Sequence, residues 1–208
     1  MSGSKRLQMP LLRRADLAAD PMDQFAVWWE AAEREVPLPE AMTLATVRPD
    51  GSPDARMVLL KGHDRRGFRF FTNYESEKAA QLSHDARAAL IVYWRELDRQ
   101  VRVRGSVSRL SAEESDAYFE TRAAGSRLGA WASPQSRPLS DREELDRLVA
   151  QTRERLGEGD IPRPAFWGGF LVEPAEAEFW QGQQARLHDR FLYAREDAGG
   201  WEIKRLAP

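Results

Sequence analysis

Short runs in which hydrophobic and polar residues alternate fill most of the chain, and this period of two predicts β-strands. Neighbouring runs are joined by short turns such as Pro49-Asp50-Gly51-Ser52 and residues 64–67, and turns of this length connect antiparallel strands. About eight antiparallel strands, without regular alternation of strand and helix, predict a mainly β fold of the barrel class. The runs that we interpret as strands are 41–48, 55–61, 68–73, 88–94, 100–110, 167–181, 188–195 and 201–206.

Helical segments accompany these strands. Asp20 is a typical N-cap and Pro21 suits the first helical position, so we expect a helix from residue 21. Capping-box pairs predict a helix after Ser111 and another from Ser140 to about residue 156. A further helix is expected at 75–85. The sequence has no G-x-G-x-x-G or P-loop motif, which argues against a doubly wound nucleotide-binding fold.

Composition narrows the class of protein. The 208 residues carry a net charge of −2, with 31 basic and 33 acidic side chains, so no overall positive field favours nucleic acid. The absence of cysteine excludes disulfides and cysteine nucleophiles and fits a reducing cytoplasm. No apolar run reaches membrane-spanning length. The sequence has no internal repeat and no linker that would divide it, so we expect a single domain at 20–208, preceded by a flexible basic arm at 1–19. We expect the protein to be cytoplasmic.

The segment Arg186-Leu187-His188-Asp189-Arg190 is the most informative stretch of the chain. In an extended strand, Arg186, His188 and Arg190 would share one face, because alternate side chains point the same way. Two guanidinium groups and an imidazole on one face suit an anionic or electron-rich ligand. From the pattern alone, an exposed polar strand face is an equally good interpretation.

A second group of residues suits a phosphate. Tyr118 and Arg122 would share a face of a helix, with Ser126 just beyond its end. A guanidinium with two hydroxyls can bind a phosphate, although an ordinary helix surface has the same pattern. Arg56 and Lys61 lie on opposite faces of a regular strand, so they would either reach two ends of a long ligand or be the charged ends of a buried strand.

Other polar positions carry weaker signals. Thr72 and Lys78 flank the start of the 75–85 helix, and helix N-termini favour anions. Gln100 shares a strand face with two arginines, at positions 102 and 104, and Gln135-Ser136 lies in a polar loop. Basic residues near hydroxyl groups, together with seven tryptophans, indicate a phosphorylated aromatic cofactor. The isolated histidines and the lack of a Gly-x-Ser-x-Gly motif argue against a metal site and a serine hydrolase.

Several stretches, in their order along the chain, resemble the pyridoxine (pyridoxamine) 5′-phosphate oxidase family. The likeness extends from Leu12 to Pro208, and its most specific element is the EFWQG…RLHDR segment at 178–190. The other matching stretches are RMVLLK at 56–61, FTN at 71–73, RQV at 99–101, GAWAS with QS at 129–136, FWGGF at 166–170 and RLAP at 205–208.

The resemblance implies a split β-barrel with peripheral helices that binds flavin mononucleotide (FMN) and works as a homodimer, with FMN in clefts between the subunits. It implies that Arg186 and His188 act at the reacting end of the substrate. The implied substrate-binding residues are Lys61, Tyr118, Arg122, Ser126, Arg186 and His188. The implied FMN-binding residues are Arg56, Met57, Val58, Leu59, Leu60, Lys61, Phe71, Thr72, Lys78, Gln100, Gln135, Ser136, Trp180 and Arg190.

The implied reaction is the oxidation of pyridoxine or pyridoxamine 5′-phosphate to pyridoxal 5′-phosphate, with dioxygen as electron acceptor and hydrogen peroxide as product. One alternative is a related flavin oxidase on another flat substrate, such as a phenazine precursor. A second is a non-catalytic protein that binds FMN or pyridoxal phosphate. A third alternative, a nucleic-acid-binding module that uses the arginines at 102 and 104, is disfavoured by the near-neutral net charge of the chain.

The chain departs from the family pattern at several positions. Glu77 stands where relatives have a second basic residue beside Lys78, and Phe71 stands in place of a tyrosine. The segments 123–125 and 183–185 also differ, and the N-terminal arm lacks a clear Arg-x-x-Tyr motif. These differences affect the expected substrate contacts more than the expected FMN contacts.

Overall fold

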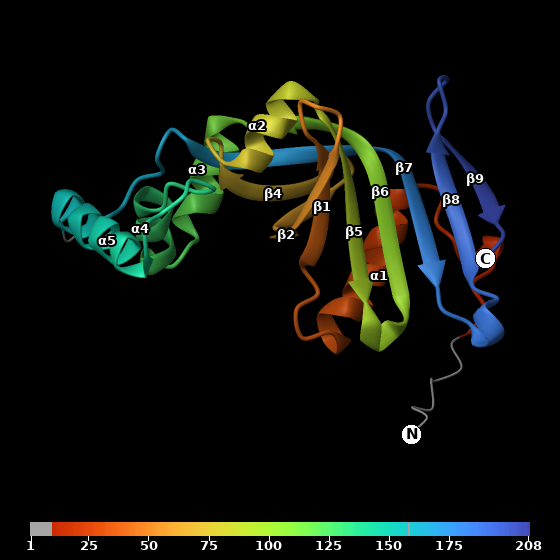
Figure 1. Cartoon of the computed structure of the whole chain (residues 1–208). Helices are drawn as coiled ribbons and strands as arrows, with labels where there is room; N and C mark the ends of the chain where they lie inside the picture. Colours follow the sequence, from red (N-terminus) through yellow and green to blue (C-terminus); the bar gives the residue numbers. More distant parts are fainter. Residues whose placement is uncertain (1–9, 158) are drawn as a thin grey trace.

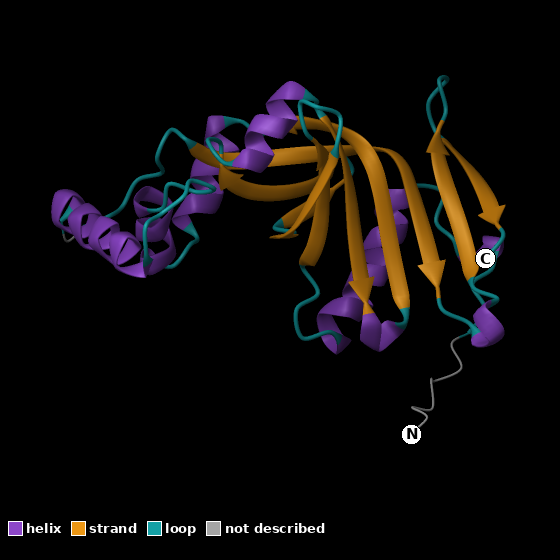
Figure 2. Cartoon of the chain, in the orientation of Figure 1, coloured by secondary structure: helices purple, strands orange, loops and turns teal. Residues whose placement is uncertain are grey.

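The computed structural model describes residues 10–157 and 159–208. It shows one antiparallel sheet that curls into a half-barrel, with helices on the sheet and others that extend away from one end of it (Figure 1, Figure 2). Within these residues the sheet has nine strands, in the order β2-β1-β5-β6-β7-β4-β3, and β8 pairs with both β7 and β9. Every pair of neighbouring strands is antiparallel. The prediction of a mainly β, antiparallel split barrel with peripheral helices is therefore confirmed.

The strands are β1 Ala41–Val47, β2 Pro53–Leu59, β3 Gly62–Asp64, β4 Gly67–Asn73, β5 Arg87–Trp94, β6 Arg99–Arg109, β7 Trp167–Gln181, β8 Asp189–Arg195 and β9 Trp201–Leu206. The helices are α1 Pro21–Glu35, α2 Glu77–His84, α3 Ala112–Glu120, α4 Ala124–Ala132 and α5 Arg142–Leu156. Short 3-10 turns lie at Arg14–Asp16, Arg95–Leu97 and Gln184–Arg186.

Local signals placed the starts of two helices correctly. Asp20 caps α1, because its carboxylate accepts a hydrogen bond of 2.7 Å from the backbone N–H of Met22. Ser111 and Glu114 form the expected capping box at the start of α3. These contacts involve neighbours in the sequence only, which is why the sequence alone reveals them.

Other local predictions were wrong. Residues 55–61 were expected to pair with 68–73, but β2 pairs with β1, and β4 pairs with β3 and β7. Tyr118 and Arg122 do not share a helix face, because α3 ends at Glu120. Ser126 does lie beyond the end of α3, but in the first turn of α4, a helix that was not predicted. At α5, Asp141 caps the helix in place of Ser140.

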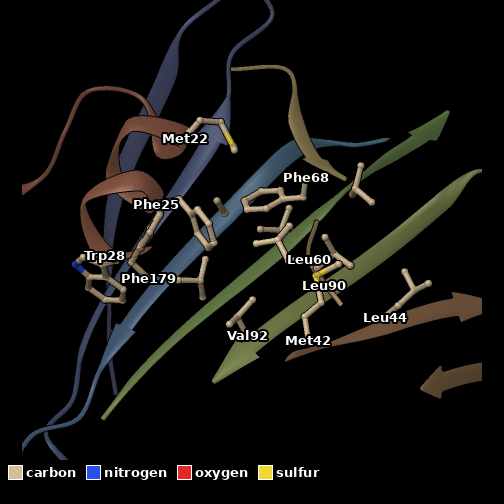
Figure 3. Packing of buried hydrophobic residues seen from close by; sticks show 14 of the residues in the cluster. Met22, Phe25, Trp28, Met42, Leu44, Leu60, Phe68, Leu90, Val92 and Phe179 are labelled. Carbon is tan, nitrogen blue, oxygen red and sulfur yellow. The ribbon is translucent and has the colours of Figure 1, made fainter. Parts of the chain in front are cut away.

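The core lies between α1 and the sheet. Phe25 of α1 is fully buried, and its ring lies 4.7 Å from that of Phe68 and 5.8 Å from that of Trp94. Figure 3 shows Phe25 and Phe68 among buried residues of several strands, including Leu90. Burial of this many large apolar side chains stabilises the curled sheet and fixes the positions of its strand ends.

The long strand β7 connects the two halves of the sheet. Its first residues, from Trp167, pair with β4, and its last residues, up to Gln181, pair with β8. Trp167 and Trp180 are 13 positions apart, which corresponds to up to roughly 40 Å along an extended strand. Figure 1 shows β7 beginning near α3 and ending near β8. Side chains at the two ends of β7 are therefore far apart within one chain.

The N-terminal segment is packed against the domain from residue 10 onward. Leu12 and Leu17 belong to the core cluster, and the backbone carbonyl of Pro10 accepts hydrogen bonds from the side chains of Gln181 and Gln183. The packed part of the chain thus begins before residue 20. Residues 1–9 of the expected arm lie outside the described residues.

Candidate functional site

A small cavity of about 240 Å³ lies between α4 and the start of β7. The guanidinium of Arg122 lies 4.5 Å over the ring of Trp167, and its Nη1 atom is buried with no hydrogen-bond partner in the described structure. Burial lowers the pKa of Arg122, although the group stays cationic near neutral pH. A buried donor without a partner is costly, so this atom is a candidate ligand for an anion. The cavity is lined by Asn73, Arg122, Ser126, Gly129, Ala130, Ser133, Gln135 and Trp167.

Three stacked aromatic rings lie beside Arg122. The Phe71 ring lies 3.9 Å from Tyr118 and 5.6 Å from Trp167, nearly parallel to both. Burial raises the pKa of Tyr118, and the nearby positive charge of Arg122 partly opposes this shift. Tyr118 therefore keeps its proton at neutral pH and can donate a hydrogen bond.

Lys78 extends this polar region toward α2. Its Nζ atom lies 2.9 Å from Oε1 of Gln135 and 3.2 Å from Oγ1 of Thr72. Burial and the neighbouring Arg56 lower the pKa of Lys78, while Glu77 opposes this shift. The structure thus adds Gln135, from a separate loop, to Thr72 and Lys78, which the sequence already placed at the start of one helix.

Arg56 and Lys61 lie near this region but already have acidic partners. Arg56 pairs with Asp54 and donates a hydrogen bond of 2.9 Å to Gln81. Lys61 lies beyond the end of β2, and its Nζ atom is 3.7 Å from Glu40. Of the expected FMN contacts between them, Met57 and Leu59 are exposed and Leu60 is buried. Val58 packs partly buried against the core. Ser136 is exposed and has a left-handed backbone with φ of 71°.

A second group of expected site residues lies at the other end of β7. Trp180 is paired with Gln100 on β6 and with Arg190 on β8. The imidazole of His188 packs on the indole of Trp180, with 4.5 Å between ring centroids. The backbone N–H of Gln183 donates a hydrogen bond of 3.1 Å to Nδ1 of His188. The structure therefore groups Gln100, Trp180, His188 and Arg190 around one indole ring.

Arg190 is held by a buried acid. Glu178, only 3% exposed, accepts a hydrogen bond of 2.7 Å from Nε of Arg190 and pairs with Arg102 as well. Nη1 of Arg190 donates a hydrogen bond of 2.9 Å to the carbonyl of Ala207. The sequence interpretation assigned no role to Glu178, although its place opposite Arg102 follows from the pairing of β6 with β7.

The prediction that Arg186, His188 and Arg190 share one face of a strand was wrong for Arg186. β8 begins at Asp189, and Gln184–Arg186 form a 3-10 turn in which Ala185 has φ of 53° and Arg186 has φ of 63°. Alternation therefore does not place Arg186 beside Arg190. Arg186 is exposed, whereas His188 is partly buried against Trp180.

The expected site residues thus form two groups in one chain. The first group, at the start of β7, contains the Arg122 cavity and Lys78. The second, at the end of β7, contains Trp180 and His188. Trp167 lies in the first group but was not predicted as a site residue. Its position in the FWGGF stretch, which resembles the family, could have indicated it.

Neither a metal-ligand cluster nor a membrane-spanning helix is found in the part of the chain that the structure describes. Among residues 10–157 and 159–208, no three His, Cys, Asp or Glu side chains gather in a group that could hold a metal ion. Across these same residues, none of the helices has the length and apolar character needed to cross a membrane.

Family models and known proteins match this chain over most of its length. Residues 29–156 match the family model described as pyridoxamine 5′-phosphate oxidase, and residues 167–208 match the pyridoxine 5′-phosphate oxidase C-terminal dimerisation region. A pyridoxine/pyridoxamine 5′-phosphate oxidase of Salinibacter ruber is 52% identical over 200 residues, covering 95% of this chain and 93% of its own. One from Bordetella petrii is 55% identical over 192 residues, covering 92% and 90%.

A solved structure is also similar. PhzG from Burkholderia lata, in complex with tetrahydrophenazine-1-carboxylic acid, has a TM-score of 0.87 and 31% identity, and the match covers 95% of this chain and 98% of that one. The family model alone covers more than half of the chain, and the curated relatives share about half of its residues over nearly its full length. The chain belongs to the pyridoxamine 5′-phosphate oxidase family.

Proposed function

We propose that this protein is an FMN-dependent oxidase that converts pyridoxine or pyridoxamine 5′-phosphate to pyridoxal 5′-phosphate, with dioxygen as electron acceptor. The observation that carries the proposal is the Arg122 cavity, where a buried guanidinium nitrogen lacks a partner beside Ser126. A phosphate monoester supplies the acceptor oxygens that this nitrogen lacks. The stacked rings of Phe71, Tyr118 and Trp167 form an apolar wall beside it, which suits an aromatic ring.

The residues near Lys78 fit the phosphate of FMN. All of the hydrogen bonds found for Lys78 go to uncharged groups, namely Thr72, Ser76 and Gln135, so its charge is available to an anionic ligand. Arg56 adds a second cation close enough to affect the pKa of Lys78. FMN, when bound, would supply a hydride acceptor that dioxygen can reoxidise. The protein would supply the phosphate contacts and the orientation of the substrate.

We also propose that the complete site requires two copies of the chain. The Lys78 and Arg122 group lies at the start of β7, and the Trp180 and His188 group lies up to roughly 40 Å further along that strand. To contact both groups of the same chain, one FMN molecule would have to reach from one end of this long strand to the other (Figure 1). A homodimer that places the second group of one copy over the first group of the other resolves this, and the match of residues 167–208 to a dimerisation region supports it.

In this arrangement Arg186 and His188 would act on the substrate from the partner copy. The exposed guanidinium of Arg186 can contact substrate groups directly. The hydrogen bond from the Gln183 backbone makes Nδ1 of His188 an acceptor, so a neutral His188 carries its proton on Nε2 and can donate it as a hydrogen bond. Together they would position the reacting end of the substrate.

A second candidate substrate is a reduced phenazine carboxylic acid, because the PhzG structure is close in fold and contains such a ligand. The unpaired Nη1 of Arg122 favours the phosphorylated vitamers, since a phosphate gives it more acceptor oxygens than a carboxylate does. The curated relatives named as pyridoxine/pyridoxamine 5′-phosphate oxidases are also more similar in sequence, at 52% and 55% identity.

The direct test is an oxygen-uptake assay on the purified protein loaded with FMN. We expect oxygen uptake and peroxide formation with pyridoxine or pyridoxamine 5′-phosphate, and much slower uptake with the unphosphorylated vitamers. Uptake with a reduced phenazine carboxylic acid alone would establish the second candidate instead. A yellow protein with no uptake on any of these substrates would refute an oxidase function and favour a non-catalytic flavin-binding role.

A further inference from the structure

Asp189, the first residue of β8, is a buried carboxylate between the two site residues His188 and Arg190. It is only 1% exposed. Its Oδ2 atom accepts a hydrogen bond of 3.0 Å from the backbone N–H of Leu12 and another of 3.0 Å from Nε2 of Gln183. Its Oδ1 atom pairs with the guanidinium of Arg205. Both carboxylate oxygens therefore have partners, as a buried charge requires.

The three partners of Asp189 come from separate parts of the chain. Leu12 lies in the N-terminal segment, Gln183 lies in the connection after β7, and Arg205 lies on β9. The carbonyl of Pro10 accepts a further hydrogen bond from the Gln183 side chain, at 3.3 Å. Asp189 thus ties both terminal regions of the chain to the segment that precedes His188.

The segment held in this way has an unfavourable backbone. Ala185 and Arg186 both have left-handed φ values, 53° and 63°, in two consecutive residues that carry a Cβ atom. Such conformations persist only where surrounding contacts impose them. Leu187 contributes little packing, because it is 68% exposed. Inside the turn, the backbone N–H of Leu187 donates a hydrogen bond of 3.1 Å to the carbonyl of Gln184. The side-chain contacts found for the turn lie at its two ends, at Gln183, His188 and Asp189.

Gln183 links the buried carboxylate to the imidazole. Its side chain donates to Asp189, while its backbone N–H donates to Nδ1 of His188. A shift of Gln183 would release the His188 ring from this hydrogen bond and from its packing on Trp180. The geometry of His188 and of the adjacent Arg186 therefore depends on a contact that touches no ligand.

We propose that Asp189 is a positioning residue, whose buried carboxylate clamps the turn at 183–188 through Gln183, Leu12 and Arg205 and so presents Arg186 and His188 to the substrate of the proposed oxidase. The inference rests on the proposed function for the identity of that substrate. The clamp itself is a property of the chain and is measurable without turnover.

The test compares the variants Asp189→Asn and Gln183→Ala with the wild type, in the FMN-loaded protein. Glu173→Gln is the matched control, because it breaks an exposed ion pair between Glu173 on β7 and Arg195 on β8, the two strands that flank the turn. Hydrogen exchange of the peptide that covers 183–188 reports the turn directly. FMN affinity, KM and kcat are then measured for each phosphorylated vitamer.

We expect Asp189→Asn to speed exchange at 183–188 while exchange in β5 and β6 stays unchanged. Its kcat/KM should fall roughly a hundredfold, as misplacement of positioning groups by an ångström can cause, with FMN affinity within about twofold of the wild type. Gln183→Ala should show the same pattern more weakly, and Glu173→Gln should behave as the wild type. A merely structural role would instead weaken FMN binding and turnover in parallel.

Several results would overturn the clamp. Unchanged exchange at 183–188 in both variants would do so, as would faster exchange with an unchanged kcat/KM. If Asp189→Asn fails to fold, Gln183→Ala decides the matter, because it leaves the Asp189 carboxylate paired with Arg205. If the wild type oxidises none of the vitamers, the proposed function fails, and the exchange data alone still decide whether Asp189 holds the turn.

Discussion

The buried carboxylate of Glu178 lies 2.7 Å from Nε of Arg190 and also pairs with Arg102, so one acid on β7 holds arginines on both neighbouring strands. The side-chain hydrogen bond that Arg190 donates to Glu178 raises the pKa of Arg190. Two positions earlier on the same strand, Glu176 pairs with the exposed Arg104. The ion pairs of Glu178 are thus more buried than the pair between Glu176 and Arg104, so substitutions at the two acids compare a buried with a more exposed ion pair.

Glu178→Gln should destabilise the protein by roughly 2 kcal/mol, because charge-assisted hydrogen bonds to a buried acid are lost and two arginines lose their counter-charge. FMN affinity should also fall, since Arg190 is no longer fixed. Urea unfolding and flavin fluorescence titration measure the two effects. Glu176→Gln, which breaks a more exposed pair with a single arginine, should change stability by less than about 0.5 kcal/mol. Equal effects of the two substitutions would contradict a special role for the buried acid.

Arg122→Ala should raise KM for the phosphorylated vitamers by roughly ten- to a hundredfold, the effect expected when a charge-assisted phosphate contact is lost. FMN affinity should be nearly unchanged, because Lys78 is not among the residues that line the Arg122 cavity. Steady-state oxygen uptake with phosphorylated and unphosphorylated substrates measures the difference. The substitution should barely affect the unphosphorylated form. Arg153→Ala, on the exposed face of α5, is the matched control and should leave all constants at wild-type values.

FMN affinity should fall at alkaline pH, because burial and Arg56 lower the pKa of Lys78. As pH rises through that lowered pKa, Lys78 loses its charge and its attraction for the FMN phosphate. Without FMN the sign reverses: the folded state binds fewer protons than the unfolded chain between the lowered and ordinary pKa values, so stability rises with pH in that window. Fluorescence titrations of FMN at several pH values check the first effect. A Lys78→Met variant that kept the wild-type pH dependence would exclude Lys78 as its source.

Acid should destabilise the protein partly through His63. Burial lowers the pKa of His63, with Glu33 opposing and Arg69 adding to the shift, and its ring packs edge-on against Phe25. The unfolded chain therefore binds a proton more readily, and stability falls as pH drops from about 6.5 through the lowered pKa. Urea unfolding at pH 7.5 and below pH 6 should show a smaller loss for His63→Gln than for the wild type. His84→Gln, at an exposed position, should match the wild type.

Phe25→Ala should lower stability by roughly 3–5 kcal/mol, the usual effect of removing a fully buried phenyl ring. Phe25 contacts rings from α1, β4 and β5, and Figure 3 shows it at the centre of the packed region. Val27→Ala on the same helix is the control, because Val27 is 61% exposed and should change stability by less than about 0.5 kcal/mol. Thermal or urea unfolding measures both. A small effect for Phe25→Ala would mean that the core can collapse around the gap.

Much of the fold was predictable because its signals are local. Alternation placed six of the strands within a residue or two, and β7 and β9 at their observed bounds. The strand β3 was missed, because three residues are too few to show a period. The break between α3 and α4 was missed as well, since no glycine or proline marks it at 121–123.

The sequence predicted many residues of the candidate site, but it did not predict how they are arranged in space. Gln135, in the loop after α4, contacts both Thr72 at the end of β4 and Lys78 on α2, which is a non-local relationship. The alternation argument failed at Arg186, because a 3-10 turn with left-handed residues replaces the expected strand there. Nothing in the residue types Ala185 and Arg186 indicates such a backbone.

The sequence by itself determined the strands, most helix starts, the family and the residue types of the site, because period, capping and motif order are properties of neighbouring residues. Only the tertiary structure decided that these residues form two groups at opposite ends of β7, that Glu178 fixes Arg190, and that Asp189 joins both terminal regions of the chain to the turn before His188. These relationships depend on strand pairing between residues far apart in the sequence, and such pairing is set by burial of the whole core.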